Sequence, residues 1–246
     1  MKMFTYPIII VSFLSISQAA HISTPVPLCE GATLVYEYKG PIPEDKLRTG
    51  DHVHIISSEI DVGKPSTTFP NLLHVAIEKS SFKGDFQKFM TTLPSVTRLV
   101  LENNQVENFK IDNLNVLPNL EILGIKGQSI GNLNAGIFSK FVHLKELHLV
   151  SANIGAIDDM AFNHAEKLEV LDLSKNKLTS LSEKTLGPLK NLKHLMLNHN
   201  QLKELAAEHL PELPELERID VEGNGITEVD VDNLKKKCPK LRVVRI

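Results

Sequence analysis

Apolar residues recur along most of this 246-residue chain at the first, fourth, sixth and eleventh positions of a unit that repeats every 24 residues. Seven full units begin at Leu72, Val96, Leu120, Leu144, Leu168, Leu192 and Leu216. A partial unit at Leu241, Val244 and Ile246 follows them, and a degenerate unit at Val53, Ile55 and Ile60 precedes them. Positions four and six alternate with variable residues, which predicts one short strand per unit with positions three, five and seven facing away from the core.

Two further sets of positions describe the rest of each unit. Asparagine stands at position nine in Asn104, Asn176, Asn200 and Asn224, where its amide can satisfy backbone groups left unpaired as the chain leaves the strand. Ser58, Ser80, Gln128 and Ala152 replace it elsewhere, so we expect those turns to be held less firmly. Position nineteen is apolar in every unit and predicts a buried spine on the returning side.

This pattern resembles the leucine-rich repeat family, in the 24-residue form common in animal extracellular proteins, over roughly residues 50–246. The resemblance implies an α/β repeat fold: a curved, horseshoe-shaped solenoid with a parallel β-sheet on the concave face and short helices or loops on the convex face. Return segments bulkier than the ~4.8 Å strand spacing would produce that curvature.

Three regions are expected along the chain. Residues 1–19 have the basic start, short apolar stretch and small-residue cleavage site of a signal peptide, which predicts secretion into extracellular fluid. Residues 20–49 carry four prolines, one cysteine and a strand-like run at Thr33–Tyr38, and are interpreted as a reduced N-terminal cap. Residues 50–246 form the solenoid of about eight to nine units, without the cysteine-rich C-terminal cap of many extracellular relatives.

Charge and cysteine content narrow the expected partners. The formal net charge is −3 with acids and bases interleaved, which argues against a nucleic-acid partner. No segment after the leader is apolar over the length of a membrane span. Cys29 and Cys238 lie at opposite ends of the expected strand stack, too far apart for a disulfide. Free thiols and a bond between chains therefore stay open, including a homodimer through Cys29 or through the C-terminal edge.

The variable strand positions carry no packing duty in this scheme and are the expected binding site. An apolar patch with a charged rim is predicted on the middle units, and we expect it to contact a protein ligand. Its residues are Ala76, Arg98, Val100, Glu102, Ile122, Lys126, Glu146, His148, Val150 and Val170. The alternative interpretation is that β-branched residues there simply favour strands.

His52, His54 and His74 form a second cluster, because the first two share a face and the third is expected beside His52 on the next strand. Three imidazoles are a weak candidate metal site or acid sensor, although solvated histidines are the commoner case. We assign no metal and no cofactor. Motifs for zinc proteases, serine hydrolases, Walker loops and dinucleotide binding are absent, and no enzyme activity is expected.

These observations favour a secreted, non-catalytic binding protein that holds a protein ligand on its concave sheet. Two alternatives stay open at this stage. One is a structural protein that self-associates outside the cell, and the other is a secreted effector of saliva, venom or immune fluid. The repeat fold serves many partners, so it gives a mode of action without naming the ligand.

Overall fold

The fold was obtained as a computed structural model, which describes residues 34–37, 51–61 and 68–246. The predicted leader therefore lies outside the described residues, as do Cys29 and most of the predicted cap. Within the predicted cap, the strand expected at Thr33–Tyr38 is present as β1 (Leu34–Glu37). It pairs in parallel with β2 (His52–Ile56), so this part of the chain extends the main sheet.

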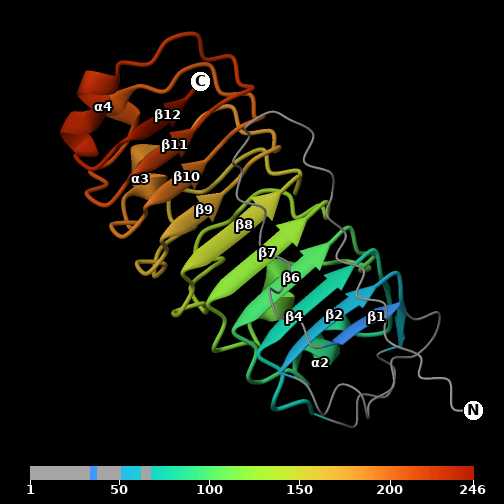
Figure 1. Cartoon of the computed structure of the whole chain (residues 1–246). Helices are drawn as coiled ribbons and strands as arrows, with labels where there is room; N and C mark the ends of the chain where they lie inside the picture. The colour runs from blue at the N-terminus through green and yellow to red at the C-terminus, as the bar shows by residue number, and fades with distance from the viewer. Residues whose placement is uncertain (1–33, 38–50, 62–67) are drawn as a thin grey trace, which may run out of the picture.

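One short strand per unit builds a parallel sheet of ten strands among the described residues, one more than the upper expectation because β1 joins it (Figure 1). The eight strands after β2 follow in chain order, and each lies beside the preceding one. They are β4 (His74–Glu78), β6 (Arg98–Glu102), β7 (Ile122–Lys126), β8 (Glu146–Val150), β9 (Val170–Asp172), β10 (His194–Met196), β11 (Arg218–Asp220) and β12 (Val243–Arg245).

The return segments lie behind this sheet and contain only short elements. Helices α2 (Phe86–Met90), α3 (Glu183–Leu186) and α4 (Val231–Lys237) alternate with 3₁₀ turns at Ile111–Leu114 and Ala207–His209. A small second sheet pairs β3 (Glu59–Asp61) with β5 (Ser81–Lys83). The solenoid fold predicted from the repeat is therefore confirmed.

The core fills the space between the sheet and the return segments. Strand positions four and six are fully buried from β2 to β11, as Leu147 and Leu149 show in β8. The predicted spine at position nineteen is buried as well, and Phe138 and Phe162 stack with ring centroids 5.4 Å apart across neighbouring units. Burial of this kind contributes about 25 cal/mol per Å² of apolar surface, which makes the stack the main source of stability.

The asparagines at position nine bind the turn of the preceding unit, as expected. The Asn176 side chain donates to the Leu149 carbonyl at 2.7 Å and accepts from the Ala152 and Ile154 amides at 3.0 and 3.1 Å. Gln128 stands at the same position in an earlier unit and is buried, yet neither atom of its amide has a hydrogen-bond partner in the described chain. The longer side chain does not reproduce the asparagine geometry.

A left-handed residue precedes each of these positions, a feature that the apolar pattern did not reveal. From Ser57 to Gly223, the eighth residue of each unit has a φ between +49° and +69°. Gly127 is one of them, and a Cβ atom there would lie 1.9 Å from the Asn103 side-chain oxygen. Glycine therefore serves two needs at this turn, the positive φ and the close approach of the neighbouring unit.

Candidate binding face

The strand register places the variable residues in three columns that run across the sheet, on the side opposite the core. In β8, for example, Glu146 belongs to the first column, His148 to the central column and Val150 to the third. All ten residues of the predicted ligand site lie in these columns, on β4 to β9. Their shared face was predictable because each variable position recurs one strand, or about 4.8 Å, further along the sheet.

The variable residues of this face are not all exposed, although the sequence predicted that none of them packs against other side chains. Ala76, Val100 and His148, all in the central column, are only 1, 3 and 2% exposed. Side chains of the two outer columns flank the central one on every strand, so its residues pack against neighbours on the sheet surface. The accessible apolar surface is therefore smaller than predicted and consists of the half-buried Ile122, Val150 and Val170.

Charged pairs border this apolar surface on the earlier strands. The Lys126 ammonium lies 2.6 Å from the Glu102 carboxylate on the neighbouring strand, and Lys79 lies 2.5 Å from Glu78. The His54 ring lies 3.6 Å from the same Glu78. Burial lowers the pKa of His54 despite that carboxylate, so the ring is neutral at neutral pH.

The three histidines of the candidate metal cluster do not converge on one point. His52 and His74 lie side by side as predicted, with ring centroids 4.0 Å apart and planes tilted by 31°, whereas His54 turns toward Glu78. Burial, followed by the neighbouring His52 and Arg98, lowers the pKa of His74. Among the residues that the structure describes, no group of three or more His, Cys, Asp or Glu side chains is arranged to hold a metal ion.

His148 lies in the middle of the face between two carboxylates. Its Nε2 atom is 3.5 Å from Glu146 of the same strand, and its Nδ1 atom is 3.6 Å from Asp172 of the next. Burial disfavours the charged ring, but Asp172 and Glu146 together outweigh it and raise the pKa of His148. The same contact lowers the pKa of Glu146. The imidazole is enclosed between these two carboxylates, so its protonation changes the net charge at the centre of the face.

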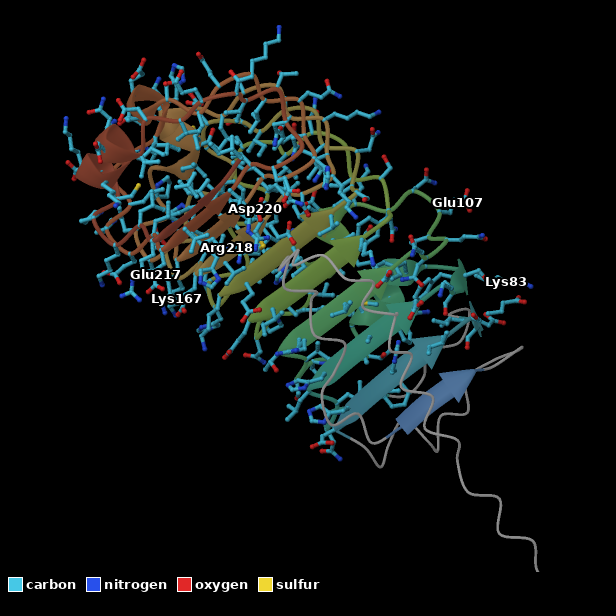
Figure 2. The ribbon with its side chains drawn as sticks, turned by 45° about the horizontal axis from the view of Figure 1, so that its top comes forward. Lys83, Glu107, Lys167, Glu217, Arg218 and Asp220 are labelled. Carbon is cyan, nitrogen blue, oxygen red and sulfur yellow. The ribbon has the colours of Figure 1, made fainter. Side chains whose placement is uncertain are left out.

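A second charged group lies on the last two strands, β11 and β12. Arg218 donates to the buried Asp220 carboxylate at 3.0 Å, and Arg245 lies 3.9 Å from the same oxygen. Figure 2 shows Arg218 and Asp220 side by side on the sheet, between the two edges of the solenoid. Asp172 and Asp220 therefore join the site, although neither was singled out in advance. Their position in the central column, beside His148 and Arg245, is the signal that could have found them.

One strand per unit in a continuous parallel stack defines the class of this protein as a repeat solenoid, and comparison with known proteins gives its family. The family model described as leucine rich repeat matches residues 142–202 and 183–226. Residues 142–226 therefore carry leucine-rich repeats, which agrees with the resemblance found in the sequence. Such repeats commonly serve as protein-binding scaffolds and are typically not enzymes. A comparison with curated proteins found no match.

Solved structures share the fold at low sequence identity. An internalin from Listeria monocytogenes is 18% identical with a TM-score of 0.60, and the match covers 80% of this chain and 54% of the internalin. FLRT2, solved in an octameric complex with Latrophilin 3 and Unc5D, is 20% identical with a TM-score of 0.60, covering 90% of this chain and 77% of that one. The chain thus spans about half of the internalin's length.

A third structure shows that partners of this fold are chemically diverse. TLR13, solved in complex with a single-stranded RNA, is 16% identical with a TM-score of 0.59 over 87% of this chain and 37% of that one. Identity this low establishes the fold alone. In the described part of this chain, no helix is long and apolar enough to cross a membrane.

Proposed function

We propose that this chain is a secreted, non-catalytic binding protein that holds a protein ligand on its concave sheet. The observation that carries the proposal is the half-buried apolar surface of Ile122, Val150 and Val170, bordered by the Glu102–Lys126 pair and by Arg98. An apolar centre with a charged rim is the usual composition of a protein interface. The FLRT2 structure supports it by analogy, because that leucine-rich repeat was solved with protein partners.

The partly desolvated charges beside this surface favour a specific partner over general adhesion. His148, Asp172 and Asp220 are each at most 3% exposed, so these polar side chains are fixed in position before a ligand arrives. Fixed complementary charges speed encounter and exclude mismatched partners more than they add affinity. The proposed ligand is therefore a protein surface with an apolar centre and polar groups that match this pattern.

The test is affinity capture from the surrounding fluid with the mature protein as bait. Ile122→Glu combined with Val150→Glu places two carboxylates on the apolar surface, and we expect at least a tenfold loss of the captured partner. The matched control is Val142→Glu combined with Met160→Glu, which changes two exposed apolar residues on return segments. Equal loss with both variants, or with neither, would overturn the placement on the sheet.

Secretion and self-association are tested separately. Mass spectrometry of the secreted chain should give a mature N-terminus after Ala19, and retention of residues 1–19 would contradict the signal peptide. Sedimentation with and without reductant examines the alternative of a homodimer through Cys29 or the C-terminal edge. A dimer that reductant dissolves would favour the structural role over ligand capture, and a monomer in both conditions would remove it.

A further inference from the structure

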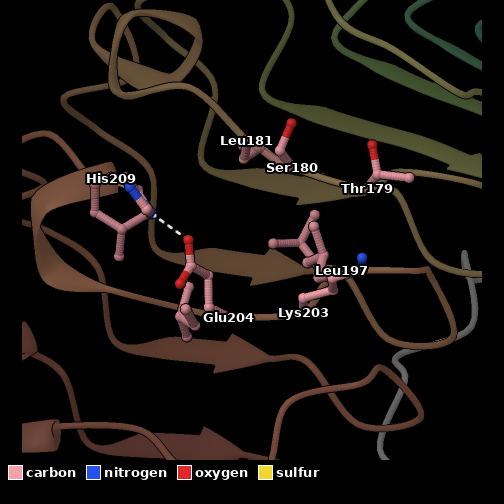
Figure 3. A pocket seen from close by; sticks show the side chains of 10 residues that line it. Thr179, Ser180, Leu181, Leu197, Lys203, Glu204 and His209 are labelled. Carbon is pink, nitrogen blue, oxygen red and sulfur yellow. Dashed lines mark ion pairs between the residues drawn. The ribbon is translucent and has the colours of Figure 1, made fainter.

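A cavity of about 330 Å³ opens between the return segments of two neighbouring units, away from the concave face (Figure 3). Leu197, Leu202 and Leu210 form its floor and belong to the buried core. Leu181 and Leu205, at the same repeat position in the two units, form its walls. An engineered cavity of about 150 Å³ lined by similar residues binds benzene, so this one can accept an aliphatic or aromatic group of about twice that size.

The cavity exists because the two return segments diverge. The last backbone hydrogen bond between them runs from the Gln201 amide to the Leu178 carbonyl at 2.8 Å. At the repeat position of Leu181 and Leu205, the earlier pair Leu133 and Ile157 forms a parallel bridge that closes the equivalent gap. Helix α3 begins two residues after Leu181, whereas Leu205 leads into a 3₁₀ turn, and the different paths leave the leucine walls apart.

Polar side chains around the mouth select the chemistry of a ligand. Figure 3 shows Thr179 and Ser180 on one side of the cavity and Lys203 with Glu204 on the other. The Glu204 carboxylate lies 3.5 Å from His209. Across the described residues, the Lys203 ammonium has no ion-pair partner and the two hydroxyls make no hydrogen bond. The mouth groups without a side-chain partner are therefore one cation and two hydroxyls, and the Glu204 carboxylate at the mouth is directed toward His209.

We propose that this cavity binds a small amphipathic carboxylate. Its aliphatic or aromatic body of about ten carbons would lie against the leucine floor. Its carboxylate would accept hydrogen bonds from Lys203, Thr179 and Ser180 at the mouth. The apolar wall supplies affinity and the cation selects the head group. The cavity lies apart from the concave face. Carboxylate binding in the cavity and protein capture on the concave face can therefore be tested separately.

The test uses decanoate as the probe, with decanol as the neutral analogue of equal length. Titration of the full mature protein is followed through leucine methyl resonances, and we expect saturable 1:1 shifts confined to Leu181, Leu202, Leu205 and Leu210. Lys203→Gln should weaken decanoate about threefold to fivefold, the range of an exposed ionic contact, and leave decanol unchanged. Lys83→Gln is the matched control, since Lys83 holds the same repeat position on a distant unit.

A second variant fills the cavity. Leu205→Phe should reduce binding of both probes at least tenfold without lowering the thermal midpoint, because the larger ring extends into the cavity and not into the packed core. Ile157→Phe, at the bridged position of an earlier unit, controls for the added volume. Shifts that do not saturate, spread over many leucines or survive Leu205→Phe would overturn the proposal. Partner capture by the concave face should be unchanged by Leu205→Phe.

Discussion

Gln128 replaces the asparagine of position nine with a longer amide side chain. Its buried amide has no hydrogen-bond partner within the described residues, whereas Asn176 at the same position binds backbone groups of the preceding turn. Leaving a buried amide unsatisfied costs about 1–3 kcal/mol. The additional methylene of glutamine therefore lowers the free energy of unfolding relative to an asparagine at this position.

Gln128→Asn should raise the free energy of unfolding by about 1 kcal/mol, because the shorter amide can reach the Leu101 carbonyl by analogy with Asn176 and Leu149. Urea denaturation measures the change as a shift in midpoint at constant slope. The matched control is Asn176→Gln, which should lower stability. An unchanged or lower midpoint for Gln128→Asn would show that the turn after β6 cannot adopt the asparagine geometry.

The raised pKa of His148 determines how its contribution to stability depends on pH. A histidine whose folded pKa exceeds its unfolded value of 6.5 stabilises the protein fully below that value and less as the pH rises through the folded pKa. His148→Gln should therefore destabilise by roughly 1–3 kcal/mol near pH 6 and by less near pH 8. Urea midpoints between those pH values check the trend, and a difference that grows with pH would refute it.

Particular residues also show which features the repeat pattern could predict and which it could not. The repeat pattern was sufficient to predict the shared face of all ten site residues and the position of His74 beside His52. It could not predict that His148 is enclosed, because burial on the sheet surface depends on the side chains of neighbouring strands. Nor could it reveal the cavity beside Leu205, which results from a difference in path between two return segments.

At the scale of elements, the edge where the strands begin carries a column of alternating charge. Glu121, Lys145, Glu169, Lys193 and Glu217 stand at the second position of successive units. Lys145 lies 2.7 Å from Glu121, and Lys193 lies 2.6 Å from Glu169. These hydrogen bonds raise the pKa of both lysines. Figure 2 shows Glu217 with Lys167 at this edge and Lys83 with Glu107 at the opposite one.

Lys193→Glu should lower the thermal midpoint, because it sets three successive carboxylates about 4.8 Å apart along the edge. The loss should shrink between about 0.01 M and about 1 M salt, since ions screen exposed charges. Lys193→Gln is the control that removes the pair without adding repulsion. A loss of the same size in high and low salt would assign the effect to packing and not to charge.

On the scale of the whole molecule, the asparagines at position nine form a ladder of side-chain hydrogen bonds between units. This asparagine ladder divides the solenoid into two parts. Asn176, Asn200 and Asn224 bind the successive turns after β8, β9 and β10 without a gap. Gln128 and Ala152 interrupt the ladder, so the turns that follow β6 and β7 lack the bonds of a position-nine asparagine. In a repeat protein each unit contacts only its neighbours, so such a gap weakens the stack locally. The units that contain Gln128 and Ala152 carry Ile122 and Val150, two residues of the proposed ligand surface.

Hydrogen exchange should reveal this division. Amides of the turn after β6, which Gln128 leaves unbound, should exchange faster than the Ala152 and Ile154 amides that Asn176 holds. Gln128→Asn should slow the turn after β6 by about fivefold to tenfold, the equivalent of roughly 1 kcal/mol of local opening, and leave the turn after β9 unchanged. Uniform exchange in the wild type would mean that core burial, and not the asparagine ladder, sets local stability. If exchange differs as expected and Gln128→Asn also weakens partner capture, then the looser middle units are retained because the ligand surface needs to adjust on binding.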